Sequence, residues 1–501
     1  MMVFSGLSYI AGDWQKGSSN EVFKGFCPGT NEYLPAAFYE SCEQLVHQAV
    51  VSAEAAFKPY RAISNAQRGE FLNTIADEIL ALGDELIEAT MLETNLPRQR
   101  LEGERGRTVN QLRAFAEVLN QDLNPLHLSV SEEADDNRLP VAKPQTRLTH
   151  IPIGVVAVFG ASNFPYAFST LGGDTAAALA AGCPVVVKAH PAHPATNELM
   201  TRAIDRAIKQ CGMPSGLFSM LQGSQHSLSH QLVSEPHVKA VGFTGSLGAA
   251  SALLDTINQR VEKIPFYGEL GSVNPQIVLK QYAVQQGAVL AKQLVNSMAM
   301  GHGQFCTSPG VWLVPDDAHH FEQAATDAVK SSPSDTLLTP GIQKAFKQAT
   351  AYLEAHPDVT LLAKGLKSKN YHACVQLYAC AARDFIDDTQ LQEEVFGPCA
   401  MLVRYRNDEE LEQVVDVLAG QLTASVYGEA SELQQKSHLI DALSYKVGRI
   451  IYNQAPTGVE VCMSMNHGGP FPSSTDVKST SVGTRALLRF LRPLCVQGQI
   501  L

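Results

Sequence analysis

An alternation of apolar strands and helical segments constrains the fold of this 501-residue chain more than any other feature. From Ile151 onward, valine-rich runs at 154–159, 184–188 and 238–243 are separated by segments whose apolar residues recur at helical spacing. This alternation is typical of a parallel sheet covered by helices. The glycine fingerprint G-x-G-x-x-G, common in dinucleotide-binding turns, does not occur in this region. The pattern therefore predicts an α/β fold without deciding what it binds.

Composition excludes several classes of protein. The chain is 45% apolar and 18% charged, with 38 basic and 50 acidic residues, which argues against nucleic-acid binding. No apolar run is long enough to span a bilayer, and no signal peptide is visible at the N-terminus. The ten cysteines form no C-x-x-C pair and no cluster with histidine. We expect a cytoplasmic protein with no metal site and no membrane or nucleic-acid partner.

One cysteine has an unusual local setting. Cys306 lies in the turn 301–310, which contains three glycines and connects a helix of small residues to the apolar strand 311–314. The glycines allow a sharp bend, and we expect those before Cys306 to leave space above the sulfur for a flat group. Free cysteine is commonly an inert core residue. A role as nucleophile therefore depends on partners elsewhere in the chain.

Five separated segments resemble motifs of the aldehyde dehydrogenase superfamily, and they occur in the order found in that family. They are Ala-Ser-Asn-Phe-Pro at 161–165, Phe-Thr-Gly-Ser at 243–246, Glu-Leu-Gly at 269–271, Gly-Gln-Phe-Cys at 303–306 and Glu-Val-Phe-Gly-Pro at 394–398. Together with Met-Asn-His-Gly-Gly-Pro at 465–470, the cysteine motif is similar to a narrower branch. That branch contains α-ketoglutaric semialdehyde (2,5-dioxopentanoate) dehydrogenases and a bacterial NADP-dependent long-chain aldehyde dehydrogenase.

The resemblance implies an aldehyde-dehydrogenase-like fold with two parallel-sheet α/β domains. A Rossmann-like NAD(P)-binding domain is expected at 1–125 and 149–270, and a catalytic domain at 271–484. Residues 126–148 and 485–501 are expected to form an oligomerisation arm and a tail. An extended arm needs a partner strand, in the same chain or in another subunit. By analogy with the family we expect a homodimer or homotetramer.

Four residues are expected to carry the chemistry. The resemblance implies that Cys306 attacks the aldehyde, and that the Asn163 amide and the Cys306 backbone N–H stabilise the oxyanion. Glu269 is the expected general base for thioester hydrolysis, with a pKa raised by an apolar setting. His467 has two readings that stay open: an imidazole beside Cys306 that favours the thiolate, or a hydrogen-bonded loop histidine.

The resemblance also implies a nicotinamide dinucleotide site. Lys188 is expected to reach the adenosine ribose, and Gly245 and Ser246 to begin a helix that faces the pyrophosphate. Glu394 is expected to bind the nicotinamide ribose, with Phe396 near the ring. The remaining expected contacts are His190, Pro191, Phe243 and Leu270.

The expected cofactor is NADP, with NAD accepted. Pro191 stands where NAD-preferring members of the family usually carry a glutamate, so no carboxylate at this position repels a 2′-phosphate. His190 and His193 are close in sequence and offer candidate cations. Gln225 and His226 stand where an arginine clamp would otherwise lie, which leaves cationic help open.

The substrate entrance is assigned to one helix and two aromatic residues. Arg107 and Gln111 share a face of the helix predicted at 102–121, and by resemblance that face lines the entrance together with Phe164 and Phe168. An arginine there could hold the carboxylate of an acidic semialdehyde in a bidentate pair.

Three alternatives stay open. Arg107 could instead be a surface residue paired with Glu104. The substrate could be a long-chain fatty aldehyde. The chain could also be a non-catalytic structural or binding protein on the same scaffold, although such a protein would be expected to lose Cys306 or Glu269.

Overall fold

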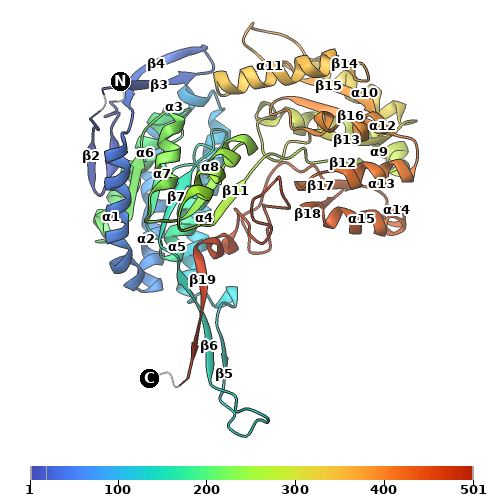
Figure 1. The fold of residues 1–501 in the computed structure, drawn as a ribbon. Coiled ribbons are helices and arrows are strands. Elements are labelled where there is room, and N and C mark those ends of the chain that lie inside the picture. The colour runs from blue at the N-terminus through green and yellow to red at the C-terminus, as the bar shows by residue number, and fades with distance from the viewer. Residues whose placement is uncertain (1–2, 19, 499–501) are drawn as a thin grey trace.

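Two seven-stranded sheets organise residues 3–18 and 20–498, the part of the chain that the computed structural model describes. Each sheet forms a lobe with its helices, and a narrow arm projects away from the lobes (Figure 1). The predicted α/β class with two sheet domains and an arm is confirmed.

The first sheet has the order β11-β10-β7-β8-β9-β1-β2. Its parallel strands are β7 (Val155–Phe159), β8 (Val185–Lys188), β9 (Phe218–Leu221), β10 (Val238–Thr244) and β11 (Phe266–Glu269). The short strands β1 (Ser8–Ile10) and β2 (Asp13–Gln15) extend it in antiparallel fashion. Strands β7, β8 and β9 are buried along their whole length, which explains why they read as continuous apolar runs rather than as an alternation.

Eight helices pack in this lobe. They are α1 (Glu43–Ala62), α2 (Asn65–Ala81), α3 (Gly83–Thr94), α4 (Arg98–Asn120), α5 (Gly173–Ala181), α6 (Pro194–Gln210), α7 (His226–Ser234) and α8 (Leu247–Gln259). Every residue of α5 is buried, in agreement with its apolar sequence. Helix α4 begins at Arg98, one turn before the predicted start at 102, because Pro97 precedes the helix as its N-cap and does not interrupt it.

The second sheet has the order β14-β15-β16-β13-β12-β17-β18, and only β14 runs antiparallel to its neighbour. Its strands are β12 (Gln276–Val278), β13 (Val311–Pro315), β14 (Thr360–Lys364), β15 (Gln376–Ala381), β16 (Cys399–Tyr405), β17 (Gln421–Tyr427) and β18 (Val447–Tyr452). Its helices are α9 (Lys280–Ala299), α10 (His319–Ser331), α11 (Pro340–Ala355), α12 (Ala382–Asp387), α13 (Asp408–Val417), α14 (Ala430–Gln435) and α15 (Ser437–Ser444).

The arm is a three-stranded antiparallel sheet in which β6 (Thr146–Pro152) lies between β5 (Val130–Glu132) and β19 (Leu491–Gln497). The predicted arm and the predicted closing strand therefore pair with each other within one chain, over residues 146–152 and 491–497. Residues 499–501 of the predicted tail, like residues 1–2, lie outside the described residues. A separate hairpin joins β3 (Val22–Cys27) to β4 (Glu32–Tyr39).

The carboxyl ends of the parallel strands position the functional residues. Thr244 and Glu269 end β10 and β11, and the segment with Asn163 follows β7. Loops at these ends are where open α/β sheets bind their ligands. Among the helices of the described part, none combines the length and hydropathy needed to cross a membrane.

Candidate active site

The turn that carries Cys306 is built from residues in a left-handed conformation. Gly301 and Gly303 have φ values of +55° and +70°. A Cβ on Gly303 would lie 2.1 Å from the carbonyl carbon of Gly397, and one on Gly301 would lie 2.2 Å from the Phe305 ring. The expectation that these glycines leave open space above the sulfur is wrong. They let the turn pack directly against neighbouring groups, which fixes the position of Cys306.

Asn274 anchors the same turn through hydrogen bonds. The sequence analysis did not identify this residue as part of the site. Its Nδ2 donates to the carbonyl oxygens of Cys306 and Ser308, at 2.9 Å each, and to that of Ser272 at 3.0 Å. Asn274 itself has a φ of +46° and is fully buried. A local pattern could not have revealed this residue, because two of the three bonds that its Nδ2 donates connect it to a turn more than thirty residues away in the chain.

Cys306, His467 and Glu269 form one buried cluster. The Cys306 Sγ lies 3.4 Å from His467 Nε2, which in turn lies 2.8 Å from Glu269 Oε1. The side chains of His467 and Glu269 are 0% and 3% exposed. Ser481, which the sequence reasoning did not identify, donates to Glu269 Oε2 at 2.5 Å. Of the two readings of His467, the structure favours the imidazole beside the thiol.

Contacts within the cluster set its charge state. Burial tends to raise the pKa of Glu269, but the charge and contact of His467, together with Ser481, bring this pKa below its ordinary value. The expectation of a raised pKa for Glu269 is wrong, because its partners are polar and charged. Burial and the Glu269 charge hold the pKa of Cys306 well above its usual range. Cys306 therefore rests as a thiol beside an ionised carboxylate.

Asn163 has a buried side chain at the cavity that Cys306 lines. Its side chain is buried, and Nδ2 donates one hydrogen bond, at 2.9 Å, to the Gln304 carbonyl. An amide nitrogen carries two hydrogens, so one remains for a ligand. Its backbone carbonyl accepts from Arg100 at 2.8 Å. Asn163 and Cys306 line the same cavity.

That cavity has a volume of ≈ 450 Å³. Besides Cys306, Asn163 and Glu269, it is lined by six of the nine residues predicted to bind the cofactor: His190, Gly245, Ser246, Leu270, Glu394 and Phe396. Ser246 caps helix α8, since its Oγ accepts from the Ala249 N–H at 3.3 Å. The helix N-terminus at this wall is a suitable place for a pyrophosphate. The donor set thus fits a nicotinamide dinucleotide.

Three predicted cofactor residues lie outside that lining: Lys188, Pro191 and Phe243. Phe243 is a core residue that packs on Phe159 and Phe266, with ring centroids 6.2 and 5.4 Å away. Its contribution to the cofactor site is indirect, because its ring packs against Gly245. A Cβ added to Gly245 would lie 2.8 Å from this ring. Burial lowers the pKa of Lys188 to about 8, with the charge of Glu40 acting in the opposite direction.

The two histidines near Lys188 do not supply the expected positive charge. The rings of His190 and His193 are stacked with centroids 5.5 Å apart. Burial, the largest influence on each, lowers the pKa of both. His193 is held by Asn197 and by the Ala161 carbonyl, both at 3.1 Å. Burial thus favours the neutral form of both imidazoles, and His190 also lines the cavity that Cys306 lines.

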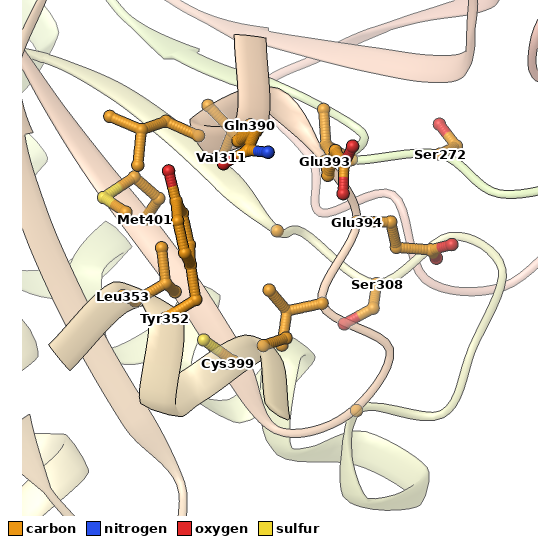
Figure 2. Close-up of a pocket in the computed structure, with 16 residues that line it drawn as sticks. Ser272, Ser308, Val311, Tyr352, Leu353, Gln390, Glu393, Glu394, Cys399 and Met401 are labelled. Atoms are coloured by element: carbon orange, nitrogen blue, oxygen red, sulfur yellow. The ribbon is translucent and has the colours of Figure 1, made fainter. Parts of the chain in front are cut away.

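A second cavity of ≈ 200 Å³ adjoins the first, and the two share Ala349, Glu394 and Val395. Figure 2 shows Glu394 at one end, near Ser272 and Ser308 and away from Met401. Burial raises the pKa of Glu394 to about 7, although the Ser272 backbone N–H opposes this. Glu394 can therefore gain or lose a proton near neutral pH at the wall between the two spaces.

On the opposite side of Cys306, an arginine lies on aromatic rings. The Arg107 guanidinium sits 5.0 Å from the Phe168 ring centroid, and its Nε donates to the Val459 carbonyl at 3.5 Å. Phe164 packs between Phe168 and Phe305, with centroids 5.4 and 5.2 Å away. Arginine over an aromatic face keeps its hydrogen-bonding edge available. The structure thus brings Arg107, Phe164 and Phe168 together.

The other predictions for helix α4 have a different outcome. Gln111 is buried, and its Oε1 accepts from the Gly483 N–H at 3.3 Å, so it supports a loop of the chain. Glu104 accepts from the backbone N–H groups of Tyr166 and Ala167 at 2.8 and 3.0 Å, and its ion pair is with Arg100 at 3.7 Å. The alternative in which Arg107 pairs with Glu104 on the surface is therefore not supported.

Comparison with known proteins supports one family assignment. Residues 14–492 match the aldehyde dehydrogenase family model. The chain is 43% identical over 500 residues to α-ketoglutaric semialdehyde dehydrogenase 2 of Azospirillum brasilense, covering 99% of this chain and 95% of that one. It is 40% identical over 475 residues to the α-ketoglutaric semialdehyde dehydrogenase of Acinetobacter baylyi, covering 93% and 89%.

Solved structures share the fold at low identity. A point mutant of Staphylococcus aureus betaine aldehyde dehydrogenase in complex with NAD+ aligns with a TM-score of 0.84 and 19% identity, covering 99% of this chain and 96% of that one. An NADP-dependent glyceraldehyde-3-phosphate dehydrogenase from Bacillus halodurans, complexed with NADP, aligns with 0.83 and 20%, covering 99% of both. With a cysteine, an amide, a carboxylate and a helix N-terminus around one cavity, and with relatives along its whole length, this chain belongs to the aldehyde dehydrogenase family and is an oxidoreductase that acts on aldehydes.

Proposed function

We propose that this dehydrogenase oxidises a short acidic semialdehyde, of the α-ketoglutaric semialdehyde class, to the dicarboxylic acid with NAD(P)+. The observation that carries the proposal is the position of Arg107, a cation stacked on Phe168 within electrostatic reach of Cys306. A substrate carboxylate at Arg107 would orient the aldehyde group toward the sulfur. Two relatives with at least 40% identity carry the name α-ketoglutaric semialdehyde dehydrogenase, which supports this substrate class.

The first step is loss of the Cys306 proton. The thiol rests protonated because burial and Glu269 raise its pKa. His467 Nε2 lies 3.4 Å from Sγ and 2.8 Å from Glu269 Oε1, so its N–H is shared with the carboxylate and does not take this proton. The proton leaves to solvent through the cavity that Cys306 lines, and the positive charge of His467 beside Sγ favours the thiolate. The thiolate then attacks the aldehyde carbon to form a thiohemiacetal.

The second step places negative charge on the former carbonyl oxygen. Asn163 Nδ2, with one hydrogen free of the Gln304 carbonyl, donates to this oxygen. Loss of one such donor typically slows the reaction by ~100- to 1000-fold. A nicotinamide dinucleotide, when bound, accepts the hydride that leaves the thiohemiacetal carbon. Glu394 and Phe396, at the far wall of the cavity, are the residues that would hold its nicotinamide end.

The third step is hydrolysis of the Cys306 thioester. Glu269 remains ionised because His467 and Ser481 keep its pKa low, so it can accept a proton from an attacking water. Its other oxygen is held by Ser481, which fixes the direction of the carboxylate. Water addition and loss of the sulfur regenerate the thiol and release the acid.

For the cofactor we propose that NADP is preferred and NAD is accepted. Pro191 stands at the position where a glutamate would repel a 2′-phosphate, and Lys188 is the candidate cation near the ribose. Glu40 is a nearby carboxylate, but Ser224 holds it through its backbone N–H at 2.9 Å and through its hydroxyl. Comparing kcat/KM for the two dinucleotides tests the proposal, and an NAD preference overturns it.

We also propose that the arm mediates a homodimer or homotetramer. Its outer strands β5 and β19 are largely exposed. Leu139 and Val141, in the loop between β5 and β6, are 89% and 68% exposed. Exposed strand edges and apolar tips of this kind are usually covered by a partner. A solution mass equal to one chain, measured by light scattering, would contradict this.

The substrate proposal is tested by steady-state kinetics on purified protein. We expect the highest kcat/KM with 2,5-dioxopentanoate, lower values with short acidic semialdehydes that lack the keto group, and the lowest with long apolar aldehydes. Arg107→Met should raise KM for the acidic substrates by about 10- to 100-fold, because a hydrogen bond to a charged group is lost. If long apolar aldehydes are the better substrates and this variant leaves KM for acidic ones unchanged, the long-chain alternative is correct.

A further inference from the structure

We propose that Arg449, on strand β18, completes with Arg107 a two-arginine site for the carboxylate of the aldehyde substrate. The inference rests on the proposed function, since it names a second residue that would recognise the same substrate class. Neither the motifs of the sequence nor the resemblance to the family pointed to Arg449. It lies in the second lobe, whereas Arg107 lies on helix α4 of the first.

The two guanidinium groups donate hydrogen bonds to the same loop. Arg107 Nε donates to the carbonyl of Val459 at 3.5 Å, and Arg449 Nη1 donates to the carbonyl of the preceding residue, Gly458, at 3.3 Å. Arg449 Nη2 also donates to the Pro456 carbonyl at 3.0 Å. These hydrogen bonds bring guanidinium groups from elements that are far apart in sequence to two consecutive residues of one loop.

Neither guanidinium group has a carboxylate at contact distance in the described residues. In residues 3–18 and 20–498, no carboxylate oxygen lies within ion-pair distance of Arg107 or Arg449. The Arg449 Nε is buried and has no hydrogen-bond partner in the same part of the chain. Glu104, Glu269 and Glu460 act on the Arg107 charge at longer range, Glu104 most strongly. Desolvated cations are normally paired at contact distance. An anion from outside would supply the missing partner.

The site lies on the substrate side of the nucleophile. Arg107 rests on Phe168, and the Phe168 ring centroid is 6.2 Å from that of His467. Both arginines interact electrostatically with Cys306. Apolar side chains surround the arginines, since Val459 and Met465 pack against the cluster that contains Phe168. A short chain with an aldehyde at one end and a carboxylate at the other fits this polarity, whereas an aliphatic aldehyde would leave both cations unpaired.

The test compares two substrates in Arg449→Met, which keeps an extended side chain and removes the charge. The readout is the ratio of kcat/KM for a short acidic semialdehyde to that for an unsubstituted aldehyde of equal chain length. We expect this ratio to fall by about 10- to 100-fold, mainly through KM for the acidic substrate. Arg449→Lys, which restores the charge, should recover part of it. The matched control is Arg404→Met, on strand β16 and paired with Glu322 at 2.8 Å, which should leave the ratio unchanged.

The outcomes separate this inference from the proposed function. If the wild-type enzyme shows no preference for the acidic substrate, the proposed function fails. If the wild type has the preference but Arg449→Met retains it, the inference fails and the proposed function stands. An equal loss with both substrates, together with a lower melting temperature, would mean that Arg449 only holds the loop around Gly458, and that also refutes the inference.

Discussion

Replacing His467 with glutamine tests the charge state of the catalytic cluster directly. Glutamine keeps a similar volume and a hydrogen-bond donor, but it carries no charge. In the wild type, His467 is the main influence that lowers the pKa of Glu269 against the effect of burial. In the variant, burial becomes dominant, and the pKa of Glu269 should rise above its ordinary value.

The expected effects have a definite sign. In the wild type the lowered pKa keeps Glu269 ionised, so its contribution to stability and to hydrolysis is lost only as pH falls through that low value. In His467→Gln the acid limb of the kcat profile should move to higher pH. At neutral pH, loss of the positive charge beside Sγ and partial protonation of the general base Glu269 should together lower kcat/KM by ~100- to 10,000-fold. An ionised buried carboxylate without its partner costs about 3–5 kcal/mol, so the variant should also melt at a lower temperature.

The assay is the pH dependence of kcat and kcat/KM, followed through formation of the reduced dinucleotide, with melting temperatures measured over the same pH range. The difference in melting temperature between wild type and variant should narrow at acid pH, where protonation of Glu269 removes the uncompensated charge. His230→Gln is a matched control. His230 bonds Thr256 at 2.7 Å between α7 and α8, away from the cluster, and its loss should leave the pH profile unchanged. An acid limb that stays in place in His467→Gln would refute the reasoning.

Three further predictions concern other parts of the site. The variant Glu269→Gln should still form the thioester on Cys306, because we assign the carboxylate to the hydrolysis step. Pre-steady-state measurements should therefore show a burst of reduced dinucleotide before a slow phase. Absence of the burst would contradict a role confined to hydrolysis. Asn274→Ala removes bonds to three carbonyls around the nucleophile and should lower kcat by about 100-fold with a smaller change in KM, whereas wild-type kcat would contradict its positioning role. Gly303→Ala introduces a Cβ 2.1 Å from Gly397 and should give little folded protein by circular dichroism; a stable, fully active variant would show that the turn can relax.

Several features followed from the sequence because their causes are local. Valine-rich runs predicted β7, β8 and β10, and these strands are apolar because they are buried within a sheet covered on its faces. The glycine-rich turn around Cys306 predicted a sharp bend, and the left-handed residues confirm it. The order of the short motifs indicated the family, since each motif combines a turn with a functional side chain.

Other features depend on contacts between distant segments, and only the tertiary structure decided them. The pKa of Glu269 was predicted with the wrong sign because its neighbours in sequence are apolar, whereas its neighbours in space are His467 and Ser481. Asn274 and Arg449 were not predicted for the same reason: their hydrogen bonds are to carbonyl groups of other loops. By itself the sequence determined the strands and the sharp turn, and it indicated Cys306 as the candidate nucleophile. The ionisation of the cluster and the placing of Arg107 and Arg449 on one loop were decided by packing, because electrostatic interactions depend on distance in space and not on separation along the chain.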